Sequence, residues 1–97
     1  MIINNLLIRL KQRDKKSIRE AKDILQRLKG NIPELLDSRV EIDVRSGESG
    51  YDIMLINTFA SQGDFQAYRE HPVHVDVSKF IVGPMETSAS LCYESDE

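Results

Sequence analysis

The sequence predicts an α+β fold whose elements follow one another in the order β-α-β-β-α-β. Three observations lead to this prediction: one segment has apolar residues at helical spacing, two segments alternate apolar and polar residues, and two further segments are apolar on both faces. The chain of 97 residues is long enough for one hydrophobic core, and we expect a single domain spanning residues 1–97.

The first half of the chain is predicted to form a strand, a helix and a second strand. Residues 2–10 are apolar and rich in β-forming residues, which indicates a strand. A helix follows between Asp14, which suits an N-cap, and Gly30, which suits a helix stop. Its apolar positions at helical spacing are Ile18, Ala21, Leu25 and Leu28. Residues 39–45 alternate apolar and charged side chains, which predicts a half-buried strand.

The second half is predicted to form a strand, a broken helix and a last strand. Residues 46–50 form a hairpin loop and residues 51–59 the return strand. Ser61 opens a short helix, and Pro72 interrupts it and starts a second segment over residues 72–81. The apolar stripe expected on that segment is Val73, Val77 and Phe80. Residues 88–94 alternate again and form the last strand.

This order of elements is the ferredoxin-like arrangement, a four-stranded antiparallel sheet with spatial strand order 4-1-3-2. Strands one and three are then central, and they alone carry apolar residues on both faces. On the third strand, Ile53, Leu55 and Phe59 lie on one side and Met54 and Ile56 on the other. Because the helices cover only one face, we expect a homodimer packed through its sheet faces. The alternative is a monomer with a mildly apolar face.

Composition argues against several partner classes. The net charge of −3 does not favour nucleic acid, and the basic residues between Lys11 and Gly30 have no aromatic residues among them, which favours a solvated helix face. No apolar run approaches the roughly 20 residues of a membrane span, so no membrane partner is expected. Cys92 is the single cysteine, and we expect a buried, inert thiol and a cytoplasmic location.

Both histidines lie in one short segment. Tyr68, His71, Pro72 and His74 form the pattern Tyr-x-x-His-Pro-x-His, which follows an apolar strand ending at Phe59. Ile32-Pro33 after the first helix and the final strand extend the likeness over nearly the whole chain. In these features the sequence resembles the stress-responsive A/B barrel (Dabb) domain family.

The resemblance implies a homodimeric α/β barrel with a pocket between helices and sheet. The family includes plant proteins linked to stress, a plant polyketide cyclase and many bacterial members without an assigned activity. In the cyclase, the counterpart of His74 is the catalytic base and that of Tyr68 lines the pocket. Three other functional positions of that enzyme fall near Asn4, Leu25 and Ile53 here, and these differences argue against polyketide cyclisation.

The residues themselves support a limited chemistry. His74 lies in the first turn of a proline-started helix, where the helix dipole favours a neutral imidazole that can accept a proton. We therefore take His74 and Tyr68 as candidate catalytic residues, and His71, His74 and Tyr68 as candidate ligand-binding residues. The alternative is a core histidine satisfied by a backbone carbonyl or by Tyr68. Two histidines without a third ligand do not predict a metal site, and no cofactor motif is present.

Three functions remain open at this point. The leading hypothesis is a homodimeric domain that binds a small, partly apolar molecule, with no established catalysis. The alternative is a cofactor-free cyclase or isomerase in which His74 is the general base and Tyr68 orients the substrate. The third is a purely structural or regulatory dimer. A cavity lined by His74 and Tyr68 would separate the first two functions from the third.

Overall fold

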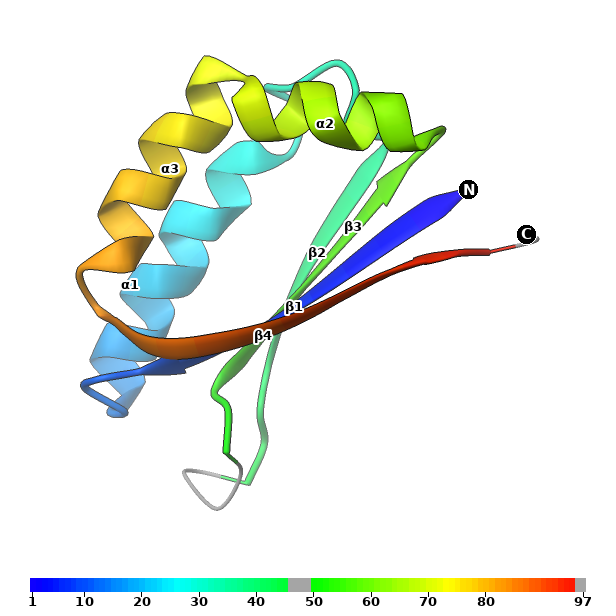
Figure 1. Cartoon of the computed structure of the whole chain (residues 1–97). Helices are drawn as coiled ribbons and strands as arrows, with labels where there is room; N and C mark the ends of the chain where they lie inside the picture. The colour runs from blue at the N-terminus through cyan, green and yellow to red at the C-terminus, as the bar shows by residue number, and fades with distance from the viewer. Residues whose placement is uncertain (46–49, 96–97) are drawn as a thin grey trace.

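The computed structural model describes residues 1–45 and 50–95, and it has the predicted order of elements (Figure 1). The elements are β1 (Ile2–Leu10), α1 (Lys15–Leu25), the 3₁₀ turn η1 (Gln26–Leu28), β2 (Asp37–Ile42), β3 (Ile53–Phe59), α2 (Gln62–Glu70), α3 (Pro72–Val82) and β4 (Met85–Glu94). The strands form one antiparallel sheet in the order β2-β3-β1-β4, which confirms the predicted topology.

Three strands differ in their bounds from the prediction, and β3 begins at Ile53 instead of residue 51. β2 runs from Asp37 to Ile42, because the Asp43 carboxylate turns back to accept the Arg45 amide at 3.0 Å and ends the extended run. β4 starts at Met85 because it pairs along the whole length of β1. Of the predicted loop over residues 46–50, residues 46–49 lie outside the described part of the chain.

Local signals in the sequence set the helix ends. The Asp14 carboxylate accepts the Ser17 amide at 3.2 Å, and the Ser61 hydroxyl accepts the Asp64 amide at 3.1 Å, so both are N-caps as predicted. Gly30 has φ of 81°, a left-handed conformation that suits glycine. Pro72 separates α2 from α3 and occupies the first turn of the second helix.

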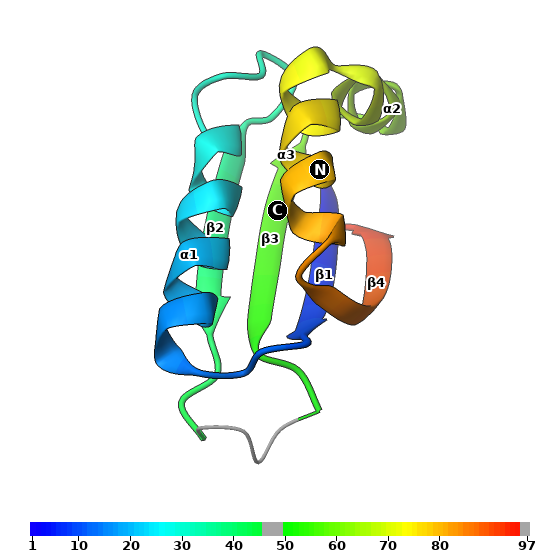
Figure 2. The ribbon, with the colours of Figure 1, turned by 90° about the vertical axis from the view of Figure 1, so that its left-hand side faces the viewer.

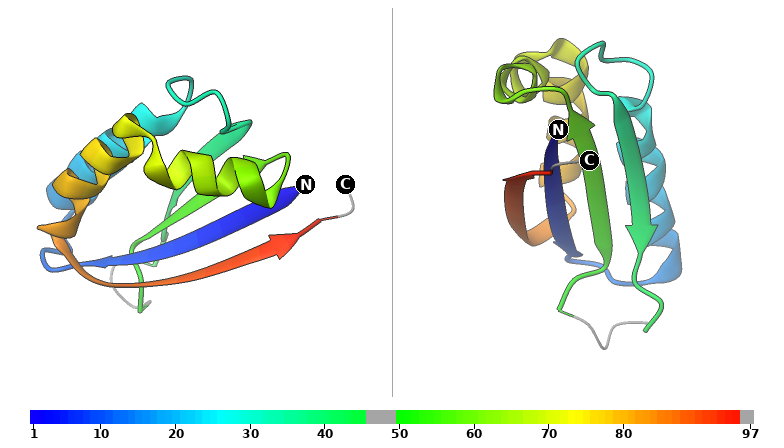
Figure 3. Two further views of the ribbon diagram at one scale, coloured as in Figure 1. Left: turned by 45° about the horizontal axis from the view of Figure 1, so that its top comes forward. Right: turned by 90° about the vertical axis from the view of Figure 1, so that its right-hand side faces the viewer.

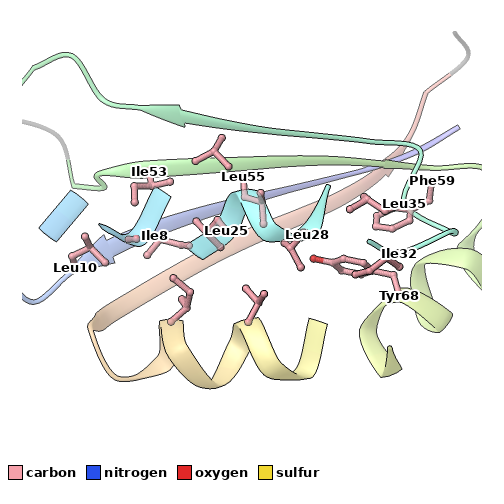
Figure 4. Packing of buried hydrophobic residues seen from close by; sticks show 14 of the residues in the cluster. Ile8, Leu10, Leu25, Leu28, Ile32, Leu35, Ile53, Leu55, Phe59 and Tyr68 are labelled. Atoms are coloured by element: carbon pink, nitrogen blue, oxygen red, sulfur yellow. The ribbon is translucent and has the colours of Figure 1, made fainter. Parts of the chain in front are cut away.

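The helices cover one face of the sheet, as seen in Figure 2. The register places Ile53, Leu55 and Phe59 of β3 on that face, and all three are buried. Figure 4 shows how side chains from the sheet, α1, η1 and the following loop meet there. The buried apolar residues are Ile2, Ile8, Leu10, Ala21, Leu25, Leu28, Ile32, Leu35, Val40, Ile53, Leu55, Phe59, Tyr68, Val77 and Ile81.

The apolar stripe of α3 is shifted relative to the prediction. Val77 and Ile81 are buried, whereas Phe80 is 52% exposed. The Arg27 guanidinium of η1 lies over the Phe80 ring, 5.8 Å from its centroid, so Phe80 packs at the rim between helices. The expectation that Phe80 belongs to the buried stripe is therefore wrong.

The opposite face of the sheet carries the second apolar set. On the central strands it presents Ile3 and Leu7 of β1 and Met54 and Ile56 of β3. The right-hand view of Figure 3 shows this face with the helices behind it. Among the described residues no helix lies on it. On β4, Leu91 and Tyr93 point to the same side and are 66% and 41% exposed.

Cys92 is exposed, which corrects the expectation of a buried thiol. It pairs with Asn4 and so faces the helix side of the sheet. α1 and α3 lie over β2, β3 and β1, and β4 extends beyond these two helices (Figure 2). An open hollow separates Cys92 from Phe65 and its neighbours on α2. A side chain on the helix side of β4 therefore meets solvent.

A buried carboxylate ties the end of β1 to the start of β3. Asp52 is 3% exposed and accepts two hydrogen bonds at 2.9 Å, from the Leu10 amide and from Arg13 Nε. Its backbone amide donates to the Ile8 carbonyl at 2.8 Å. Asp52 thus fixes the β1–α1 connection against β3, a role that the sequence pattern did not reveal.

Replacing Asp52 by alanine leaves the buried Leu10 amide without its acceptor. We expect the free energy of unfolding to fall by about 1–3 kcal/mol, which urea unfolding measures. Glu41→Ala is the control, because the exposed Arg39–Glu41 pair is worth roughly 0–1 kcal/mol at most. Equal losses for the two variants would contradict the role assigned to Asp52.

Candidate functional site

The junction between α2 and α3 positions both histidines. His71 is extended, with φ of −65° and ψ of 137°, as expected for a residue before proline. Its Nδ1 accepts the Val73 amide at 3.1 Å, so the half-buried ring caps α3. His71 thereby fixes the turn from which His74 projects.

His74 has a defined tautomer. Its Nδ1 lies 2.9 Å from the Arg69 carbonyl oxygen, and because that oxygen can only accept, Nδ1 carries the proton and donates it. In the neutral ring Nε2 is then the acceptor, and the Ser78 hydroxyl lies 3.4 Å from it. The imidazole is held at one nitrogen by backbone and meets a hydroxyl at the other.

The environment favours the neutral form of His74. Burial lowers the pKa of His74 below its ordinary value of 6.5, the hydrogen bond to the Arg69 carbonyl opposes this shift, and the Arg69 charge adds to it. A neutral ring was predicted from the helix N-terminus. The direction agrees with that prediction, and burial is the largest cause.

Tyr68 contacts His74 through its ring rather than its hydroxyl. The two ring centroids are 4.5 Å apart at 49°, and Phe59 packs against Tyr68 at 4.9 Å. The Tyr68 hydroxyl points into the apolar layer (Figure 4), where it accepts a hydrogen bond from Asn57 Nδ2 at 3.0 Å. Burial raises the pKa of Tyr68 to about 12, an effect that the Asn57 bond opposes.

Asn57 and Ser38 complete this network and were not identified from the sequence. Both are buried, and the Ser38 hydroxyl donates to Asn57 Oδ1 at 2.6 Å. The available signal was an amide on the buried side of β3, between Leu55 and Phe59, where the alternation calls for an apolar residue.

An open hollow of about 480 Å³ lies beside His74 on α2 and α3. Its walls are Arg69, His74, Val75, Ser78, Lys79 and Val82, and we call it the His74 hollow. Of the predicted site residues only His74 lines it. The Tyr68 ring contacts the His74 ring from the core side, and His71 caps the helix that carries His74. The three predicted site residues therefore do not line one common surface.

A larger hollow, of about 640 Å³, lies between α1 and β2. Asp14 lines it, and the pKa of this carboxyl is lowered mainly by its hydrogen bond to Ser17 in the helix cap. Within residues 1–45 and 50–95, no three His, Cys, Asp or Glu side chains gather as metal ligands would. None of the helices in this part of the chain is long and apolar enough to cross a membrane.

Comparisons with known proteins identify the family and support the fold. The model of the family described as "Stress responsive A/B Barrel Domain" (Dabb) matches residues 5–94. No curated protein matches the chain. A dimeric protein of unknown function with a ferredoxin-like fold from Bacteroides fragilis is 22% identical, with a TM-score of 0.82 over 97% of this chain and 95% of that chain.

Two plant structures share the fold as well. A protein from Arabidopsis thaliana is 21% identical, with a TM-score of 0.85 over 100% of this chain and 97% of that chain. The hydroxynitrile lyase from Passiflora edulis is 20% identical, with a TM-score of 0.81 over 99% and 94% of the two chains. At these identities the likeness shows a common fold, whereas the family match covers nearly the whole sequence. The chain belongs to the stress-responsive A/B barrel (Dabb) domain family.

Proposed function

We propose that this chain is a homodimeric Dabb domain that binds a small, partly apolar molecule in the His74 hollow. The observation that carries the proposal is the imidazole held at Nδ1 by a backbone carbonyl, whose Nε2 meets Ser78 between apolar walls. Val75 and Val82 form those walls and are 42% and 61% exposed. A ligand with one hydrogen-bond donor and an apolar body fits this combination.

The homodimer rests on the open sheet face. Ile3, Leu7, Met54 and Ile56 form an apolar strip on the two central strands, and Leu91 extends it onto β4. Two such faces pack about 10 Å apart in sheet-on-sheet structures. The Bacteroides fragilis protein of the same fold is described as dimeric, which supports the same assembly here.

A cofactor-free cyclase or isomerase is the second candidate. Its support is the neutral tautomer of His74, which leaves Nε2 as the proton acceptor that a general base requires. In this function Tyr68 acts by holding the imidazole, since its hydroxyl is bonded to Asn57 in the core. We retain a cytoplasmic location in the proposal, supported by the single cysteine, which leaves no intrachain disulfide.

Ile56→Asp tests the dimer. An unpaired charge on the apolar strip opposes burial against a second copy, so we expect sedimentation at the 11.1 kDa chain mass instead of twice that value. Phe80→Asp is the control, because Phe80 is exposed on the helix side and its replacement should leave the dimer intact. A wild-type chain that sediments as a monomer at micromolar concentration refutes the assembly.

His74→Ala tests the ligand site. We expect this variant to stay folded and to lose the thermal stabilisation that members of a small-molecule panel give the wild type. If His74 serves only as a buried hydrogen-bond partner, its loss costs roughly 1–3 kcal/mol and leaves the response to ligands unchanged.

His71→Ala is the matched control for His74→Ala. It removes the cap of α3, which costs about 0.5–2 kcal/mol, and should lower the melting temperature while the ligand response persists. A ligand response lost in His71→Ala and kept in His74→Ala would place the site elsewhere.

The pH dependence of stability tests the state of His74. Because its folded-state pKa lies below 6.5, the unfolded chain takes up the proton first as pH falls. The contribution of His74 to stability is therefore level above 6.5 and is lost progressively below it. Between about pH 7.5 and 5.5, urea unfolding should show a larger loss for the wild type than for His74→Gln. Equal losses would show that the His74 pKa is not lowered.

A further inference from the structure

The ligand-binding proposal assigns no reaction to Ser78, which forms a set of reactive groups together with His74. Ser78 stands one helical turn after His74 on α3, and both side chains line the same hollow. The Ser78 hydroxyl lies 3.4 Å from Nε2, and Nδ1–H donates to the Arg69 carbonyl at 2.9 Å. The Ser78 hydroxyl therefore contacts a base, the His74 imidazole, and the Arg69 carbonyl on the other side of the ring orients that base.

This sequence of contacts is the one that activates a serine. A serine hydroxyl is a weak nucleophile until an adjacent base takes its proton, and the base needs a third group that fixes its tautomer. The Arg69 carbonyl does this by holding the proton on Nδ1, which turns the Nε2 lone pair toward Ser78. A separation of 3.4 Å is long for a hydrogen bond, and nucleophile–base contacts are often longer without substrate.

We propose that the His74 hollow hydrolyses small carboxylic esters with an apolar acyl group, with Ser78 as nucleophile and His74 as general base. The proposal rests on the proposed ligand site and assigns it a substrate class. The apolar walls at Val75 and Val82 suit the acyl chain, and the open shape of the hollow admits a small ester from solvent.

The hydrolysis proceeds in two steps, acylation of Ser78 and hydrolysis of the acyl-enzyme, and its reactants are the ester and water. Ser78 Oγ forms a bond to the ester carbonyl carbon as its proton passes to His74 Nε2. The carbon–oxygen bond to the alcohol then breaks, and the departing oxygen takes the proton from Nε2. Water next attacks the acyl-Ser78 carbonyl and gives a proton to Nε2, which returns it to Oγ as the acid leaves.

The charges around the hollow suit the intermediates. Attack places a negative charge on the carbonyl oxygen, and the hollow is lined by two cationic residues, Lys79 and Arg69. The Arg69 guanidinium lies over the Phe65 ring, 5.8 Å from its centroid. Lys79 follows Ser78 in the chain and lines the same hollow, so we assign the stabilisation of this charge to Lys79. The orienting group is a neutral carbonyl rather than a carboxylate, so it stabilises the imidazolium less and a slow esterase is expected.

A fluorophosphonate probe and p-nitrophenyl butyrate test the proposal on the wild-type chain. The probe forms a bond to a serine oxygen as fluoride leaves, and peptide mass mapping identifies the serine. We expect Ser78 to be labelled and the wild type to release p-nitrophenolate. Ser78→Ala and His74→Ala should each lower the release rate by roughly a hundredfold, the lower end of what a positioned proton-transfer group contributes.

Ser90→Ala is the control, because Ser90 is exposed on β4 and does not line the hollow. It should hydrolyse the ester at the wild-type rate. Labelling of another residue, such as Lys79, or undiminished hydrolysis by a folded Ser78→Ala overturns the proposal. Ligand stabilisation that depends on His74 without labelling of Ser78 refutes the esterase and leaves the binding function standing. Labelling of Ser78 in a wild-type chain that no member of the small-molecule panel stabilises refutes the binding function alone.

Discussion

The placement of the candidate site depends on one polar side chain in the core. A buried amide without hydrogen bonds costs about 1–3 kcal/mol, so Asn57 constrains whatever packs over it. It is satisfied by Ser38 at 2.6 Å and by the Tyr68 hydroxyl at 3.0 Å. Tyr68 is thereby fixed on α2, and its ring supports His74 across the break at Pro72. A hydrogen-bond network inside the sheet thus decides where an imidazole lies on the surface of α3.

The sheet imposes the second constraint, because its central strands are apolar on both sides. The helices bury Ile53 and Leu55 of β3 and leave Met54 and Ile56 on the other face. A chain this short buries only about 60–65% of the surface that its unfolded state exposes. A second copy on the open face would therefore enlarge a limited core, and it would leave the helix side, with the His74 hollow, accessible to ligand.

Local signals made most of the fold predictable, and neighbours decided the rest. Asp14, Ser61 and Pro72 set helix ends through hydrogen bonds or a missing amide within the same turn, so the sequence alone revealed them. Phe80 and Ile81 both fit a helical stripe after Val77, and only the position of the neighbouring helix decides which is buried. The alternation of β4 did not show which side of the strand meets the helices, and Cys92, on the helix side, lies beyond α1 and α3 and is exposed.

In the candidate site, too, the sequence indicates the residues and their neighbours decide what each one does. Its two histidines are three positions apart and make different hydrogen bonds to the backbone. His71 accepts a backbone amide at Nδ1, so its ring is used in starting α3. His74 donates from Nδ1 to a backbone carbonyl, which leaves Nε2 for the hollow. The motif names both residues, but the tautomer of each depends on which backbone group its ring meets after folding. Asn57 and Ser78 were missed for a related reason: the partner of Asn57 on α2 and the orientation of the His74 ring toward Ser78 are decided only when the helices pack. The fold therefore uses one ring nitrogen of His74 for a backbone carbonyl and leaves the second beside the Ser78 hydroxyl.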